Sequence, residues 1–208
     1  MPKSIEKLTN LTILDLSQNQ LKTVPETIRK LTKLTSLNFQ GNQLETFPRT
    51  VVKLTSLTNL YLGGNQLKTV PETIGKLTNL FLLTLYRNQL EILPKTIGNL
   101  VSLNYLFLGE NQLKALPETI GNLKNLMHLD LHENQLRTFP SSISKLKRIT
   151  VLNLRSNHFN LPPETYDLPP QEQILQILKW QTAHQTKTLR PIHAVSYTHL
   201  TLPTICSV

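Results

Sequence analysis

Leucines alternate with more variable residues along most of the chain, and the alternation recurs at a fixed spacing. In residues 57–67, LTNLYLGGNQL, Leu60 and Leu62 are separated and flanked by non-leucine positions. A period of two is typical of a strand that buries one face and exposes the other. We therefore predict a short strand here and in every copy of the pattern, with successive strands lying parallel at about 4.8 Å.

An asparagine follows each predicted strand, at the point where the chain must turn. Each of these asparagines lies 23 residues after the previous one: Asn19, Asn42, Asn65, Asn88, Asn111, Asn134 and Asn157. An asparagine side chain that points inward has two donors and an acceptor, so a stack of them can satisfy the backbone groups of neighbouring turns. We therefore expect a structural asparagine ladder, in which an unpaired buried group would cost roughly 1–3 kcal/mol.

The second half of each unit returns apolar side chains to the core from the opposite wall. In the unit that starts at Leu57, Val70 and Pro71 are followed by Ile74 and Leu77. Proline fixes its own φ angle and favours a tight turn or the start of a short helical segment. One unit cannot bury its own leucines, so neighbouring units must stack to cover them.

The pattern Leu-x-x-Leu-x-Leu-x-x-Asn-x-Leu, repeated every 23 residues, resembles the leucine-rich repeat family over most of the chain. The resemblance implies an α/β solenoid of horseshoe shape, with parallel strands on the concave face and short helical or irregular segments on the convex face. It also implies that the protein binds partners on its curved surface. The Leu-Pro-x-x-Ile-x-x-Leu segment is similar to the 23-residue class of cytosolic Ras-binding scaffolds and of leptospiral and cyanobacterial repeat proteins.

The repeat register predicts about seven repeats in residues 1–168. The segment Pro2–Leu8 aligns with Pro25–Leu31, so the first repeat is truncated. This truncation indicates a fragment of a parent protein that extends upstream, and a natural start with an abbreviated repeat is the alternative.

The apolar period changes after residue 168. Ile174, Ile177 and Leu178 fall on one helical face, so we predict a C-terminal capping helix over residues 169–182. A helix that docks another domain is the alternative. Residues 183–208 have no repeat register, and we expect an irregular tail, either a disordered linker or a translated non-coding sequence.

The outward strand positions vary between repeats while the core positions stay constant, so specificity is expected on the concave face. Aromatic and apolar residues converge there on three adjacent predicted strands, and acidic residues flank them. The predicted partner-binding residues are Tyr61, Leu82, Tyr86, Arg87, Tyr105, Phe107, Glu110, His128, Asp130 and His132. Aromatic side chains dominate interface energies. The alternative is that these rings pair across the strands and support the sheet.

The net charge of +9 raises the possibility of a nucleic-acid partner. The outward strand positions carry four acids, Asp15, Glu110, Asp130 and Glu133, against two bases, Arg87 and Arg155. The excess lysines recur on the predicted convex side, where a charge row is usually a solvated face. We therefore expect a protein partner and a monomeric chain, and not nucleic acid.

The remaining sequence features narrow the function class. Cys206 is the single cysteine, so no disulfide framework exists, which favours a cytoplasmic location. No apolar run approaches the roughly 18 residues of a membrane span. His128, Asp130 and His132 alternate as zinc ligands can, but no third ligand beyond Asp130 is evident, so we predict no metal and no cofactor.

The sequence contains no glycine-rich phosphate loop, no Gly-x-Ser-x-Gly elbow and no His-Glu-x-x-His motif. We therefore predict a non-catalytic protein-binding module. The ending NLPPETYDLPPQEQILQILKWQ is similar to the join between repeats and the GTPase domain in Roco proteins. The alternative function is thus the recognition arm of a larger Roco-like GTPase, or of another signalling enzyme, whose catalytic domain lies outside this chain.

Overall fold

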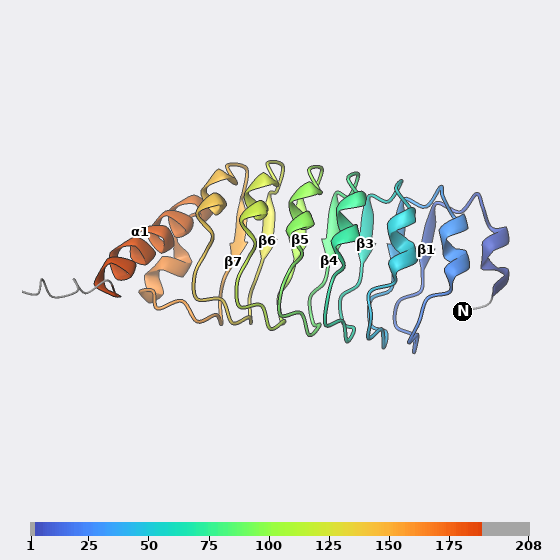
Figure 1. The fold of residues 1–208 in the computed structure, drawn as a ribbon, viewed down its shortest axis with the longest axis horizontal. Helices are drawn as coiled ribbons and strands as arrows, with labels where there is room; N and C mark the ends of the chain where they lie inside the picture. Colours follow the sequence, from blue (N-terminus) through green and yellow to red (C-terminus); the bar gives the residue numbers. More distant parts are fainter. Residues whose placement is uncertain (1–2, 189–208) are drawn as a thin grey trace, which may run out of the picture.

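The computed structural model describes residues 3–188, which form an elongated array of repeated units (Figure 1). One parallel sheet of seven strands runs through the array in sequence order. The strands are β1 (Ile13–Asp15), β2 (Ser36–Asn38), β3 (Asn59–Tyr61), β4 (Leu82–Thr84), β5 (Tyr105–Phe107), β6 (His128–Asp130) and β7 (Val151–Asn153). Each residue pairs with its equivalent in the next unit, as Leu60 does with Leu83. The predicted parallel strands and their register are confirmed.

A short 3-10 helix forms the opposite side of each unit. These helices are η1 (Lys3–Lys7), η2 (Glu26–Lys30), η3 (Arg49–Lys53), η4 (Glu72–Lys76), η5 (Lys95–Asn99), η6 (Glu118–Asn122), η7 (Ser141–Lys145) and η8 (Pro163–Asp167). Helices η2 to η8 each follow a proline, and Pro71 before η4 has a φ angle of −72°. That angle is already the one a helix needs, so the proline sets where the helix begins.

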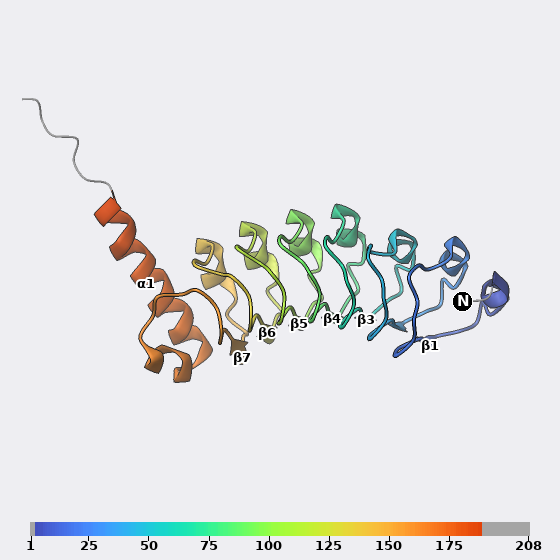
Figure 2. The ribbon, with the colours of Figure 1, turned by 90° about the horizontal axis from the view of Figure 1, so that it is seen from below.

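The strands lie on the inner side of a shallow arc and the helices lie on its outer side (Figure 2). The inward leucines of the strands and the isoleucines of most helices fill the space between the two layers, and residues such as Leu60, Leu83 and Ile74 are fully buried. Val51 in η3 and Tyr166 in η8 take the place of the isoleucine. This arrangement confirms the leucine-rich-repeat solenoid that the sequence predicts, with parallel strands on the concave face. In the part of the chain that the structure describes, no helix has the length and apolar character needed to cross a membrane.

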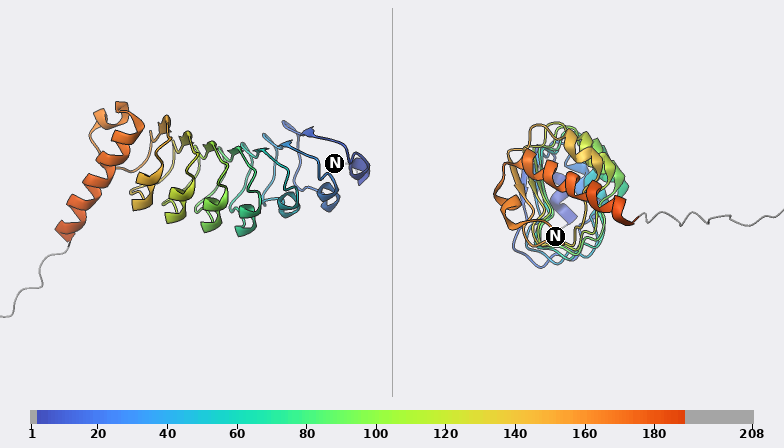
Figure 3. Two further views of the ribbon diagram at one scale, coloured as in Figure 1. Left: turned by 90° about the horizontal axis from the view of Figure 1, so that it is seen from above. Right: turned by 90° about the vertical axis from the view of Figure 1, so that its left-hand side faces the viewer.

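Helix α1 (Pro170–Thr188) lies across the end of the array, against η7 and η8 (Figure 3). Ile174 and Ile177 are buried on its inner face. Gln181 binds both backbone groups of Phe139: its Oε1 accepts the Phe139 amide at 2.8 Å and its Nε2 donates to the Phe139 carbonyl at 2.9 Å. A glutamine side chain thus occupies the place where a further repeat would otherwise lie.

The expectation that an irregular tail begins at residue 183 is wrong for residues 183–188, which continue α1. Residues 183–188, AHQTKT, include a single apolar residue, so the hydrophobic period could not reveal this part of the helix. The rings of Trp180 and His184, one helical turn apart, stack with centroids 4.4 Å apart, and such pairs support a helix. The rest of the predicted tail, residues 189–208, lies outside the described residues.

The residue before each ladder asparagine adopts the left-handed region of φ. Gly41 and Gly64 do so without steric cost, whereas Arg87 at +50° and Glu110 at +55° hold a conformation that L-residues rarely adopt. Each unit therefore leaves its strand through the same sharp turn, which brings the asparagine side chain inward.

Glycines control how closely the 3-10 helices stack. The backbone of Gly98 in η5 lies directly against the Thr119 carbonyl of η6, and Gly121 lies in the same way against Ser142 of η7. This close approach lets Thr119 Oγ1 donate to the Lys95 carbonyl at 2.5 Å. The equivalent hydroxyls of Thr96 and Ser142 also donate to the preceding helix.

Carboxylates add a second link between these helices. Glu72 in η4 accepts the backbone amides of Lys95 and Thr96 at 3.3 and 3.2 Å. Glu118 in η6 accepts the amides of Ser141 and Ser142, each at 3.2 Å. Helix η5 therefore donates one hydroxyl and two backbone amides to Glu72 of η4. Helix η7 donates the same set of groups to Glu118 of η6.

Candidate functional site

The strand register brings the predicted partner-binding residues onto one face of the sheet. Leu82, Tyr105 and His128 face one another across β4, β5 and β6. Thr84 lies between Tyr61 and Phe107 in the next row. We call this face, from β3 to β6, the concave surface.

Ring contacts run along the concave surface. The rings of Phe107 and His128 lie 4.7 Å apart, and those of Tyr105 and His128 lie 6.3 Å apart. Tyr61, Tyr105 and Phe107 are half-buried, so part of each ring remains open to solvent. The rings thus contact one another across the strands, as expected if they support the sheet. They also leave apolar area open to solvent, which a binding surface needs.

Phe81 belongs to this surface, although the sequence analysis did not include it. Its ring contacts Tyr105 edge-on at 5.2 Å, and 43% of the residue is exposed. The equivalent position is a threonine in the three preceding units, at Thr12, Thr35 and Thr58. The available signal was an aromatic ring at a position that is polar in every other unit except at Met127.

Two glycines give large side chains of the next unit room to lie flat on the sheet. A Cβ on Gly63 would overlap the ring of Tyr86, and a Cβ on Gly109 would overlap the ring of His132. The positions of Tyr86 and His132 are therefore set by the absence of a side chain one unit earlier.

Thr84 lies at the centre of the concave surface. Only 6% of the residue is exposed, and its Oγ1 has no hydrogen-bond partner among the described residues. A buried hydroxyl without a partner is costly.

A chain of charged contacts borders the rings. Arg87 Nε lies 2.7 Å from Glu110 Oε2, and His132 Nε2 lies 3.6 Å from Glu110 Oε1. His132 Nδ1 lies 2.7 Å from Asp130 Oδ1. The hydrogen bond from Arg87 lowers the pKa of Glu110, which keeps this carboxylate ionised.

The two histidines have opposite pKa shifts. Burial lowers the pKa of His128 below its usual value of 6.5. Burial also acts to lower the pKa of His132, but the hydrogen bond to Asp130 and the negative charges of Asp130, Glu110 and Glu133 outweigh it, so the pKa of His132 is raised above 6.5.

We expect NMR titration of the imidazole Cε1 protons to place the midpoint of His132 above that of His128. Because its pKa is raised in the folded state, protonated His132 stabilises the fold below about pH 6.5, and this contribution is lost as the pH rises through the raised pKa. Asp130→Asn should move the His132 midpoint down, because it removes the hydrogen bond and the charge that raise this pKa. Equal midpoints for His128 and His132 would contradict the electrostatic account.

Metal ligation was one interpretation of His128, Asp130 and His132. Between Lys3 and Thr188, no group of three or more histidine, cysteine, aspartate or glutamate side chains has a metal-binding arrangement. In the structure, His128 packs against Phe107, and His132 binds Asp130. The concave surface therefore presents aromatic area and carboxylates to solvent.

Comparison with known proteins identifies repeats along the chain. A family model described as a leucine-rich repeat region matches residues 1–80 and 88–169. A second model, described as a leucine rich repeat, matches residues 55–113. No curated protein sequence matches the chain.

Several solved structures are similar to the chain. A leucine-rich repeat protein of Leptospira interrogans is 36% identical with a TM-score of 0.64, and the match covers 86% of this chain and 50% of that one. The ectodomain of the Arabidopsis thaliana membrane receptor kinase GASSHO1/SCHENGEN3, solved in complex with CASPARIAN STRIP INTEGRITY FACTOR 2, is 34% identical with a TM-score of 0.70, over 76% of this chain and 20% of that one. Internalin C2 of Listeria monocytogenes is 29% identical with a TM-score of 0.69, over 76% and 68% of the two chains.

The chain spans half the length of the leptospiral protein and a fifth of the receptor ectodomain. The similar structures include a receptor ectodomain as well as bacterial proteins, so the cytoplasmic location stays a prediction.

Proposed function

Since this chain belongs to the leucine-rich repeat family, we propose that it binds a partner protein on its concave surface and carries out no catalysis itself. The observation that supports this proposal is the cluster of partly exposed rings on β3 and β5, on either side of β4. Aromatic anchors surrounded by polar groups are typical of protein interfaces.

The surrounding charges define what the partner would present. Glu133 makes no ion pair within the described chain, and Glu110 and Asp130 lie beside it around His132. Apolar side chains of the partner would cover Tyr61, Tyr105 and Phe107, and a basic group would face the acids. Solvent-exposed charges at the edge contribute mainly to the association rate and specificity, while the rings contribute affinity.

The triple substitution Tyr61→Ala, Tyr86→Ala and Phe107→Ala should weaken partner binding at least thirtyfold, about 2 kcal/mol. The partner would first be captured on the immobilised chain, and its affinity for each variant would then be measured by isothermal titration calorimetry. The control is Ile92→Ala with Val101→Ala, which removes exposed apolar area outside the sheet. A triple variant that stays folded and keeps full affinity would place the site elsewhere, for example on the convex lysine rows.

A second candidate is that the chain is the recognition arm of a larger signalling enzyme, such as a Roco-like GTPase. The observation that favours it is that the match covers half of the leptospiral chain and a fifth of the receptor ectodomain. A phosphate-binding loop encoded downstream in the full gene would support this candidate, and its absence from the full gene would exclude a GTPase.

A further inference from the structure

The close stacking of the 3-10 helices stops in the first half of the array. The position held by Gly75, Gly98 and Gly121 is occupied by Arg29 in η2 and Val52 in η3. A side chain at this position keeps the following helix at a greater distance, because the glycine contact with the next backbone is no longer available.

Where the glycine is replaced by a larger residue, the hydroxyl of the next helix no longer donates to the preceding helix. Thr50 of η3 is equivalent to Thr96 and Thr119, whose hydroxyls donate to the preceding helix. Thr50 Oγ1 has no partner among the described residues, although only 8% of Thr50 is exposed. The hydroxyl of Thr27 in η2 is also buried without a partner.

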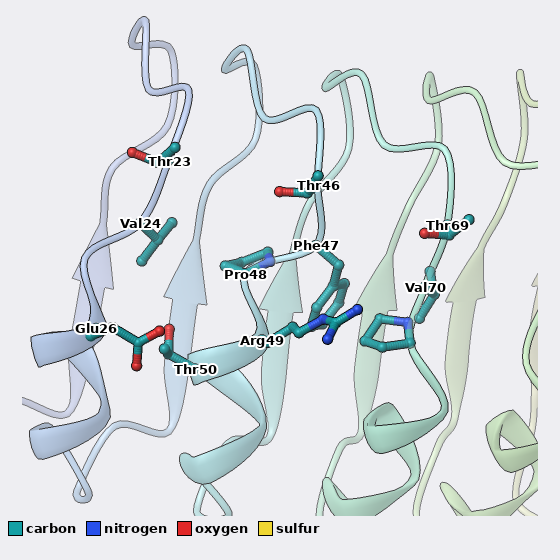
Figure 4. A pocket seen from close by; sticks show the side chains of 11 residues that line it. Thr23, Val24, Glu26, Thr46, Phe47, Pro48, Arg49, Thr50, Thr69 and Val70 are labelled. Carbon is teal, nitrogen blue, oxygen red and sulfur yellow. The ribbon is translucent and has the colours of Figure 1, made fainter.

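A groove of about 600 Å³ opens where the helices separate, across the loops that lead into η2, η3 and η4 (Figure 4). We call it the side groove. Its volume lies within the range of roughly 300–1,000 Å³ that is usual for ligand sites. Phe47 and Val70 give it an apolar wall, and the hydroxyls of Thr23, Thr46 and Thr69 recur along it at the spacing of the repeats.

Two charged groups of the side groove have no ion-pair partner in the described chain. Glu26 points toward Thr50, and the side chain of Arg49 extends from the next helix beside Phe47 (Figure 4). The wider surroundings are basic: in residues 22–30, 45–53 and 68–76, Lys or Arg occupies seven positions (22, 29, 30, 49, 53, 68 and 76) and Glu occupies three (26, 45 and 72). Glu72 is already bound by the amides of η5.

We propose that the side groove is a second binding site, separate from the concave surface, which takes an acidic and aliphatic polypeptide segment. A carboxylate of the segment pairs with the Arg49 guanidinium, which suits planar bidentate recognition. Aliphatic side chains of the segment cover Val24 and Pro71, the half-buried apolar residues that line the groove.

The test uses a fluorescein-labelled peptide of alternating Glu with Leu or Val, titrated with the whole chain and followed by fluorescence anisotropy at about 0.15 M salt. Arg49→Glu should weaken binding at least tenfold. Lys95→Glu is the matched control, because it reverses the charge at the same position of η5, where the helices are closely stacked. That variant should change the affinity less than twofold.

Thr50→Val provides an independent measurement. The substitution removes an unpaired hydroxyl while keeping the side-chain shape, so the melting temperature should stay the same or rise. Peptide affinity should stay unchanged, because this hydroxyl is buried beneath the surface of the groove and the segment pairs with Arg49.

Three results would overturn the proposal. One is the absence of peptide binding to the original chain. Another is an equal loss of affinity in Arg49→Glu and Lys95→Glu, because it would show that the peptide responds only to the overall positive charge. The third is tighter, Arg49-dependent binding of a short RNA duplex or of phosphatidylserine vesicles, which would assign the side groove to a different class of partner.

Discussion

Replacement of Asn88 by alanine should lower the free energy of unfolding of the array by about 1–3 kcal/mol. Asn88 is 8% exposed, and its Oδ1 accepts the amide of Leu67, one unit earlier, at 2.9 Å. Its Nδ2 donates to the carbonyls of Leu62 and Leu85, each at 3.0 Å. Alanine would leave the Leu67 amide buried and unpaired, and each carbonyl would keep only its bond from a neighbouring asparagine, Asn65 or Asn111. Urea denaturation followed by circular dichroism measures the change.

Asn19→Ala is the matched control for this prediction. Asn19 is exposed, and its Nδ2 bonds only the carbonyls of Leu16 and Ser17 in its own turn, at 3.1 and 2.7 Å. These groups can bond to water when the side chain is removed, so the expected loss is below about 1 kcal/mol. Equal losses for Asn19→Ala and Asn88→Ala would refute the ladder as the source of stability.

Gly98→Ala should destabilise the protein by about 2–3 kcal/mol. In most helices this substitution stabilises slightly, because alanine has less conformational freedom to lose on folding. Here the new Cβ would overlap the backbone carbonyl of Thr119, which cannot rotate away as a side chain can. The two helices would have to separate, and the bond from Thr119 Oγ1 to the Lys95 carbonyl would break.

Asn122→Ala in η6 is the control for the glycine prediction, since it changes an exposed position of a neighbouring helix. Thermal unfolding should show little change for Asn122→Ala and a clear drop in the melting temperature for Gly98→Ala. If Gly98→Ala instead raised the melting temperature, the close stacking of η5 on η6 would not contribute to stability.

The sequence predicted the repeating elements well because their signals are local. Alternating leucines identify each strand, and a proline such as Pro71 identifies where each helix begins. The separation of the helices around η3 was not predicted, because it depends on which side chain meets the next unit. Only a comparison of Arg29 and Val52 with the glycines at the same position in later units carries that information.

The concave surface was predicted in part. The 23-residue spacing places Tyr61, Tyr105 and Phe107 on one face of the sheet, and the structure has Tyr61 on β3 and the other two on β5, with β4 between them. The burial of Thr84 and the flat position of Tyr86 could not be read from one unit, because both depend on side chains of neighbouring units. Whether these residues bind a partner stays a prediction.

The bonds between the 3-10 helices run continuously from η4 to η7 and are missing around η3. When a force bends the array, the hydrogen bonds between η4 and η7 keep these helices from moving apart. Bending is therefore concentrated around η3, where these bonds are missing. The concave surface extends from β3 to β6 and therefore begins at the compliant part and continues onto the stiff part. A partner that contacts both β3 and β6 would therefore change the curvature of the solenoid near η3, while β5 and β6 keep their arrangement.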